Sequence, residues 1–211
     1  MNTPFTFTHT TIQATAQPMP AIVLLHGMGS NEQDLQQLLQ GLSLPAHVFA
    51  IRGPISHPPG YAFFQIGEEE QPVRQTFDKV IVALQQFIEE IVKYYNVDPS
   101  RILLVGFNQG AVIAQTAALT VGDKIAGFAA LSGFLPRFVK EEYVKKDVSH
   151  IKGFISHGQY DYIYPYALGQ QSANLFEAYE ASVVFKSYAD GHGVTAENRQ
   201  DLQQFIQEVL V

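Results

Sequence analysis

The sequence predicts an α/β protein built on one mostly parallel β-sheet with helices on both faces. Short apolar runs alternate along the chain with stretches of helical periodicity, which is typical of strands joined by crossover helices. The runs are rich in β-branched and aliphatic residues and are nearly continuous, as expected of strands buried on both faces. The 211 residues contain no internal repeat and no linker-like change of composition, so we expect a single domain over residues 1–211.

Six segments are expected to form the strands of this sheet. Each is a short run dominated by aliphatic or aromatic residues, with polar residues, Gly or Pro close to its ends. In chain order they are Ala21–Leu25, Val48–Ile51, Ile102–Val105, Ile125–Leu131, Gly153–Ser156 and Val183–Tyr188.

Two helices have the clearest periodicity. Between the second and third strands, apolar residues recur at the three- and four-residue steps of an amphipathic helix, and they comprise Val73, Phe77, Val80, Ile81, Leu84, Ile88, Ile91 and Tyr95. The last helix is expected over Ala196–Leu210, where Leu202, Phe205, Ile206 and Val209 would be buried in the same way.

Composition excludes several classes of function. The formal net charge of -7 and the pI near 5.4 argue against nucleic acid or an anionic membrane surface as the main partner. Cysteine is absent, so the chain has no disulfide, no thiolate metal site and no cysteine nucleophile. No apolar run is long enough to span a bilayer, and Met1–Thr15 is too polar for a signal peptide, so we expect a cytoplasmic protein. A monomer and a homodimer both fit the sequence.

The segment "VGFNQGAVIA", Val105 to Ala114, joins the third expected strand to a helical pattern. A glycine on each side of a strand-to-helix turn is typical of a nucleophile elbow, which exposes one reactive side chain at its tip. Gly106 and Gly110 are placed as such a turn needs them, and the tip residue between them is Asn108, where a serine is expected.

Polar or glycine-rich segments follow four of the expected strands. They are His26-Gly-Met-Gly-Ser30, Asn108-Gln-Gly110, His157-Gly-Gln-Tyr-Asp161 and Asp190-Gly-His-Gly193. Ligands of open α/β sheets bind outside the carboxyl ends of the strands, so these segments are expected to form one site. An elbow residue, then an acid at Asp161, then a histidine at His192 is the chain order of the α/β-hydrolase triads.

The chain resembles the phospholipase/carboxylesterase family of α/β-hydrolases, the small bacterial carboxylesterases related to acyl-protein thioesterases. The resemblance runs through "LLHGMGSNEQDL", "IRGP", "GYAFFQI", "VGFNQGAVIA", "LSGFLP", "ISHGQYDYIYP" and "GHGVT", and so covers nearly the whole chain. It implies an α/β-hydrolase fold without a cap domain, no cofactor, and hydrolysis of small carboxylic esters, lysophospholipids or thioesters by a Ser-Asp-His triad. Asp161 matches the acid of the triad, His192 matches the base, and Asn108 falls on the serine.

Backbone donors are expected to complete such a site. In α/β-hydrolases the oxyanion hole uses one N–H from the residue after the nucleophile and one from the first glycine-rich loop, which here are Gln109 and Met28. Any strand-to-helix turn also has free N–H groups, so a purely structural turn fits the same residues. We interpret His26 and His157 as structural, and no ligand spacing supports a metal site built from them with Asp161 and His192.

Aromatic residues are frequent in the loops at the same edge of the sheet. Tyr61, Phe63, Phe64, Phe134 and Tyr162 are candidates for an apolar acyl pocket, together with Phe138, Tyr160, Tyr164 and Tyr166. They fit equally well as loop residues that cover the core.

Asparagine at the tip removes the chemistry of the triad. A carboxamide is a poor nucleophile and carries no proton that a histidine can remove to make it a good one. We therefore predict that the chain is an inactive or nearly inactive esterase, through natural loss of the serine or through an engineered substitution. Two alternatives are a binding module that holds an ester without cleaving it, and a hydrolase that uses an aspartate nucleophile after deamidation of Asn108.

Overall fold

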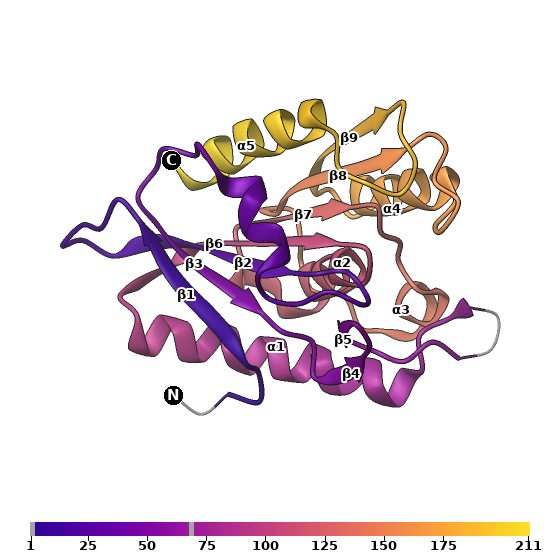
Figure 1. Ribbon diagram of the computed structural model, residues 1–211, viewed down its shortest axis with the longest axis horizontal. Coiled ribbons are helices and arrows are strands. Elements are labelled where there is room, and N and C mark those ends of the chain that lie inside the picture. The colour runs from indigo at the N-terminus through magenta and orange to yellow at the C-terminus, as the bar shows by residue number, and fades with distance from the viewer. Residues whose placement is uncertain (1–2, 68–69) are drawn as a thin grey trace.

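A computed structural model describes residues 3–67 and 70–211 of the chain (Figure 1). The strands are β1 (Phe7–Ile12), β2 (Met19–Leu25), β3 (Ala46–Ile51), β4 (Ile55–His57), β5 (Gly60–Ala62), β6 (Val97–Phe107), β7 (Gly127–Leu131), β8 (Lys152–Gly158) and β9 (Ser182–Tyr188). The α-helices are α1 (Arg74–Tyr94), α2 (Gln109–Val121), α3 (Arg137–Glu142), α4 (Tyr166–Ala178) and α5 (Ala196–Leu210), with short 3₁₀-helices η1 (Asp34–Leu39) and η3 (Gly122–Lys124).

Seven of these strands form one sheet, in the order β1-β3-β2-β6-β7-β8-β9, and β4 pairs with β5 in a separate hairpin. β1 runs antiparallel to β3, and all other neighbouring strands of the large sheet are parallel. The carboxyl ends of the parallel strands therefore meet at one edge of the sheet, toward which the arrowheads of β6, β7 and β8 point in Figure 1. The loops that follow these strands can act together there.

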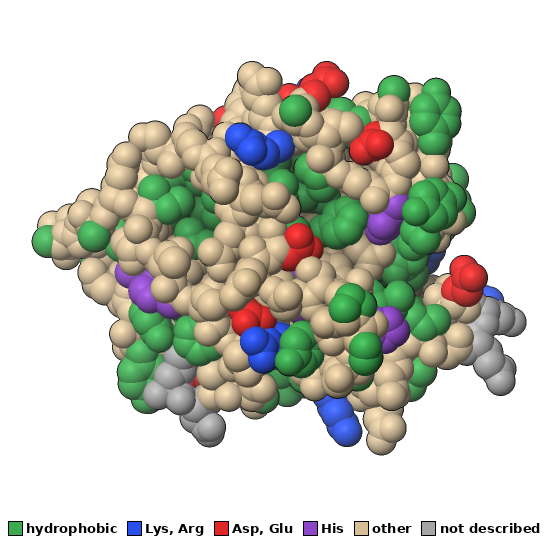
Figure 2. All heavy atoms as spheres, in the orientation of Figure 1, with side chains coloured by type: hydrophobic (Ala, Val, Ile, Leu, Met, Phe, Trp, Pro, Cys, Tyr) green, Lys and Arg blue, Asp and Glu red, His purple; other side chains and the backbone are tan. Residues whose placement is uncertain are grey.

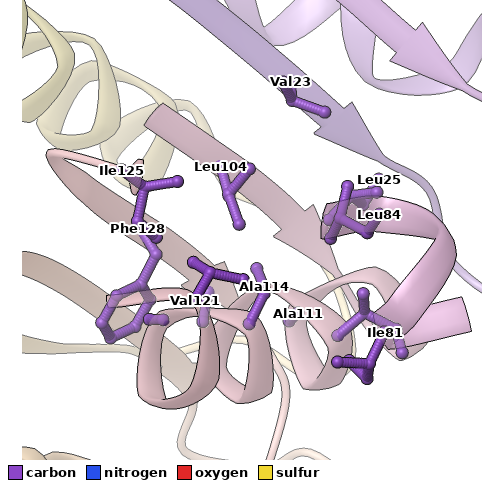
Figure 3. Packing of buried hydrophobic residues seen from close by; sticks show 14 of the residues in the cluster. Val23, Leu25, Ile81, Leu84, Leu104, Ala111, Ala114, Val121, Ile125 and Phe128 are labelled. Atoms are coloured by element: carbon purple, nitrogen blue, oxygen red, sulfur yellow. The ribbon is translucent and has the colours of Figure 1, made fainter. Parts of the chain in front are cut away.

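Helices cover both faces of the sheet, as the sequence predicts. α1, α2 and α4 contribute Phe87, Val112 and Phe176 to the core on one face, whereas η1 and α5 contribute Leu38 and Leu202 to the core on the other. In Figure 3, Ala111 and Ala114 of α2 face the strand that carries Leu104, and Ile81 and Leu84 of α1 lie to one side of them. Within the described residues, no helix is both long and apolar enough to cross a membrane.

All six predicted strands are present, although their ends differ from the predicted ones by a few residues. The prediction that each strand is buried on both faces is wrong for β9, because it lies at the edge of the sheet and alternates between exposed and half-buried residues. On α5, Leu210 is buried and Val209 is only half-buried, so the predicted burial of Val209 is also wrong in detail.

Three strands were not predicted from the sequence. β1 is a threonine-rich segment that pairs only with β3 and leaves much of its surface exposed, so it lacks an apolar run. β4 and β5 are three-residue strands on either side of a turn that contains Pro58 and Pro59. Such short pairs carry little periodicity for sequence reasoning to detect.

Candidate active site

The turn between β6 and α2 consists of one residue, Asn108. Its backbone has φ 52° and ψ -118°, a strained conformation that lies outside the left-handed helical region and that few residues other than glycine adopt. The flanking glycines are required by close packing: a Cβ atom on Gly106 would lie 2.2 Å from the carbonyl oxygen of Gly110, and one on Gly110 would lie 1.8 Å from that of Leu25. The structure thus has the strand-to-helix turn that the sequence predicts.

The side chain of Asn108 bridges the first glycine-rich loop and the histidine after β9. Its Oδ1 atom accepts a hydrogen bond of 3.1 Å from the backbone N–H of Met28. Its Nδ2 atom lies 2.8 Å from Nε2 of His192. Because a backbone N–H can only donate, the carbonyl end of the carboxamide must face Met28, and the NH₂ end then donates to the imidazole.

His192 in turn contacts Asp161. Its Nδ1 atom lies 2.8 Å from Oδ2 of Asp161, whose side chain is fully buried. Since Nε2 accepts from Asn108, the imidazole is neutral with its proton on Nδ1, and that proton is donated to the carboxylate. The other carboxylate oxygen accepts backbone N–H bonds of 2.9 Å from Ile163 and from Tyr164. The three side chains predicted at the strand ends are therefore in one hydrogen-bonded row.

The two remaining histidines of these loops are buried, and each forms a hydrogen bond with a backbone group. Nε2 of His26 accepts a 2.9 Å bond from the N–H of Gly53. Nε2 of His157 donates a 2.7 Å bond to the carbonyl of Tyr164 and lies 3.3 Å from Oδ2 of Asp161. Burial lowers the pKa of both imidazoles, so both are neutral at physiological pH. In the part of the chain that the structure describes, no three His, Asp or Glu side chains are grouped to hold a metal ion.

Met28 and Gln109 are the two residues expected to supply backbone N–H donors at the site. The N–H of Met28 points at the Asn108 carboxamide, and Gln109 is the first residue of α2, so its N–H has no acceptor within the helix. The side chain of Gln109 has a role that the sequence prediction overlooked. Its Oε1 accepts from the N–H groups of Phe63 (2.9 Å) and Phe64 (3.3 Å), and its Nε2 donates to the carbonyl of Phe64 (3.0 Å).

The first glycine-rich loop is fastened to the β4–β5 hairpin. The N–H of Gly29 donates to the carbonyl of Tyr61, and the N–H of Tyr61 donates to the carbonyl of Ser30, both at 2.8 Å. Beside this ladder Arg52 forms two hydrogen bonds with the buried carboxylate of Glu32, of 2.7 and 2.6 Å, and its guanidinium lies over the Tyr61 ring. These contacts fix the position of the Met28 N–H.

The candidate pocket aromatics differ in what they contact. Phe63 is fully buried against the His26 ring, which agrees with the alternative that it covers the core. Phe134 is also buried, with its ring centroid 4.8 Å from that of Tyr164. Tyr162 is 82% exposed and points away from the core.

Tyr164 contacts the site most directly of these aromatics. Burial raises the pKa of its hydroxyl to about 12, and this effect outweighs a smaller interaction with the Asn108 side chain that lowers the same pKa. Its ring lies edge-on to the His192 imidazole, with centroids 5.6 Å apart, and Phe107 covers the imidazole from another side at 5.0 Å. The sequence placed Tyr164 among the aromatic loops but gave no signal that its hydroxyl reaches Asn108.

Two open grooves flank the row of side chains. One, of about 480 Å³, is mainly apolar, and its lining includes Met28, Ile55, Phe64, Ile66 and Val73. The other, of about 420 Å³, is more polar, and its lining includes Asp34, Gln37, Phe107, Gly193, Thr195 and Arg199. Figure 2 shows hydrophobic side chains reaching the surface together with a histidine at the edge where the strands end.

Comparison with known proteins relates the whole chain to one group of hydrolases. The family described as Phospholipase/Carboxylesterase matches residues 8–210. Acyl-protein thioesterase 1 of Kluyveromyces lactis is 30% identical over 94% of this chain and 96% of its own, and the putative hydrolase MhqD of Bacillus subtilis is 26% identical over 90% and 94%. The crystal structure of a Bacillus cereus carboxylesterase has the same fold, with a TM-score of 0.87, 23% identity, and coverage of 97% of this chain and 94% of that one.

Proposed function

Because the chain belongs to the phospholipase/carboxylesterase family of α/β-hydrolases, we propose that it retains the ester-binding site of a carboxylesterase and that Asn108 keeps this site inactive or nearly so. Asn108 stands in the position of the nucleophile, His192 in that of the base and Asp161 in that of its orienting acid. The N–H groups of Met28 and Gln109 are the donors for a developing oxyanion.

One observation carries this proposal: an unbroken row of hydrogen bonds from the Met28 N–H through Asn108 and His192 to Asp161. An ester hydrolase needs a donor for the oxyanion, a base beside the nucleophile and an acid that orients the base. Each of these groups is within hydrogen-bond distance of the next. The hydroxyl that would receive the acyl group is the missing part.

Asparagine cannot supply that hydroxyl. In the triad mechanism the imidazole removes the proton of the serine as its oxygen attacks the carbonyl, and the nitrogen lone pair of a carboxamide is delocalised and unreactive. Loss of the nucleophile costs about a millionfold in turnover in a well-characterised serine protease, and we expect a loss of the same order for Asn108.

The grooves indicate how an ester would lie. The apolar groove begins at Met28, beside the oxyanion donor, and its lining of Ile55, Phe64, Ile66 and Val73 suits an acyl chain. The more polar groove borders Phe107 and Gly193, next to His192, on the side from which a leaving alcohol or thiol would take its proton. We propose small carboxylic esters, lysophospholipids or thioesters as the class of ligand.

The test is an ester-hydrolysis assay of three proteins: the chain with Asn108, Asn108→Ser and Asn108→Ala. Asn108→Ser is expected to hydrolyse a short activated ester several orders of magnitude faster than the other two. Asn108→Ala is the matched control because it also removes the carboxamide, yet supplies no nucleophile. Adding His192→Ala to the serine variant should abolish the gained activity. Turnover by the freshly prepared chain with Asn108 comparable to that of Asn108→Ser would contradict the proposal.

A binding module is the second candidate function, and one observation favours it. The Asn108 carboxamide satisfies both the Met28 N–H and the His192 lone pair, so the site is ordered without a nucleophile. Two results together would favour the binding module over the inactive esterase: Asn108→Ser folds but hydrolyses no ester, and the chain with Asn108 binds a fatty acid in calorimetry.

A further inference from the structure

We propose that the site acts on its own Asn108: water hydrolyses the side-chain carboxamide to a carboxylate and releases ammonia. The inference rests on the proposed function, since it uses the same oxyanion donor and the same base. It differs in naming the amide bond within the chain as a bond that this site cleaves. Its product is a chain with aspartate at position 108.

The carboxamide lies where an acyl substrate would be activated. Its carbonyl oxygen accepts a 3.1 Å bond from the Met28 N–H, and Asn108 precedes the N-terminus of α2, where the helix dipole favours negative charge. A tetrahedral oxyanion formed from this carbonyl would be stabilised in the same position. The leaving nitrogen is Nδ2, which lies 2.8 Å from Nε2 of His192.

The reaction balances with water alone. The hydrogen bond from Nδ2 of Asn108 to Nε2 of His192 must first open, because it occupies the one lone pair of the neutral imidazole. A water oxygen then adds to Cγ of Asn108 as Nε2 takes one proton of that water, and the carbonyl electrons move onto Oδ1. The Cγ–Nδ2 bond then breaks, the oxyanion electrons return, and Nδ2 leaves as ammonia with the proton from Nε2. Asp161 stabilises the transient imidazolium through its bond to Nδ1. Free ammonia and the new carboxyl group then equilibrate their protons with solvent.

The product fits the contacts that are already there. The carboxylate formed at position 108 would accept from the Met28 N–H and would lie at the positive end of α2. It can also accept from the Tyr164 hydroxyl, which burial keeps protonated. On the other side it would face His192, which can carry a proton between two carboxylates, that of Asp161 and the new one.

This route is distinct from ordinary deamidation. In the ordinary route the backbone nitrogen of the following residue attacks Cγ, and the cyclic imide then opens to a mixture of aspartate and isoaspartate. Here that nitrogen belongs to Gln109, whose side chain is held by three hydrogen bonds to Phe63 and Phe64. Ring closure would pull the first residue of α2 away from these bonds, whereas hydrolysis by water leaves the backbone in place.

The experiment follows the freshly purified full chain by mass spectrometry of its peptides during incubation in heavy-oxygen water at mildly alkaline pH. We expect Asn108 to be converted to aspartate without isoaspartate, with one heavy oxygen incorporated. In His192→Ala the conversion should be about a hundredfold slower, the usual contribution of a positioned base. Asn198 is the internal control, because it is equally buried but donates to the Ser156 hydroxyl instead of an imidazole, and it should stay unchanged.

Any one of three results would overturn the inference: Asn108 stays unchanged, Asn108 is converted at the same rate with and without His192→Ala, or isoaspartate is a main product. Asp161→Asn is a second variant in case His192→Ala does not fold, and it should also slow the conversion. The ester assay of Asn108→Ser separates the two proposals. An active serine variant beside a stable Asn108 refutes only this inference, and an inactive serine variant refutes the esterase proposal.

Discussion

The buried side chain of Gln109 allows a quantitative test of how the turn is held to Phe63 and Phe64, which directly follow β5. Gln109→Met keeps the length of the side chain and removes its polar atoms. The N–H groups of Phe63 and Phe64 and the carbonyl of Phe64 would then lose their partner. Gln109 is fully buried, so water cannot readily take its place.

The loss of stability expected for Gln109→Met follows from the number of buried backbone groups left without a hydrogen-bond partner. A buried backbone group left without a partner costs about 1–3 kcal/mol, and the 3.3 Å bond to Phe64 is the weakest of the three. Allowing for the gain from burying an apolar side chain, we expect Gln109→Met to lower the free energy of unfolding by about 4 kcal/mol. For a chain of this size the melting temperature should fall by about 10 °C.

Gln115→Met is the matched control on the same helix. Gln115 is equally buried, but it makes one 3.3 Å bond to the carbonyl of Ala111, and among the described residues its Oε1 has no hydrogen-bond partner. Replacing it should change the free energy of unfolding by less than about 1 kcal/mol or stabilise the protein. Urea titrations of both variants would measure the difference. Equal losses, or a loss below about 1 kcal/mol for Gln109→Met, would refute the reasoning.

Two further predictions concern stability. The free energy of unfolding should fall as pH drops below 6.5, the ordinary histidine pKa. Burial lowers the pKa of His26 and His157 in the folded chain, so the unfolded chain binds protons first. Melting curves on both sides of that pH test this, and an unchanged melting temperature would contradict it. Gly110→Ala should lower the free energy of unfolding by more than about 3 kcal/mol or prevent folding, since its Cβ would meet the Leu25 carbonyl at 1.8 Å. Gly191→Ala is the control and should be tolerated, because its nearest contacts lie at 3.9 Å. Circular dichroism and soluble yield compare the two variants.

The parts of the fold that the sequence predicted are those whose signal is local. Ile102–Val105 of β6 is a continuous apolar run, and Gly106 and Gly110 mark the turn after it because no side chain fits there. β1 could not be predicted in the same way. Its threonine-rich sequence becomes a strand only because β3 offers an edge to pair with, and that edge exists only in the folded sheet.

The same distinction holds for the candidate site. The order of Asn108, Asp161 and His192 along the chain, together with the strands before them, predicted that they meet. The bond from Gln109 to the hairpin and the contact of Tyr164 with Asn108 join segments far apart in sequence. Their residue types are unremarkable, so only the packing of the loops shows these contacts.

Asparagine fits this turn through its side chain, whose two polar ends match a donor at Met28 and a lone pair at His192. The backbone at this position is strained for any residue with a Cβ atom. Serine also matches a neutral imidazole, because its hydroxyl donates to Nε2. A carboxylate at the same position has no proton to donate, so it matches only a protonated His192. The identity of residue 108 therefore decides both whether a nucleophile is present and which form of the imidazole the site favours.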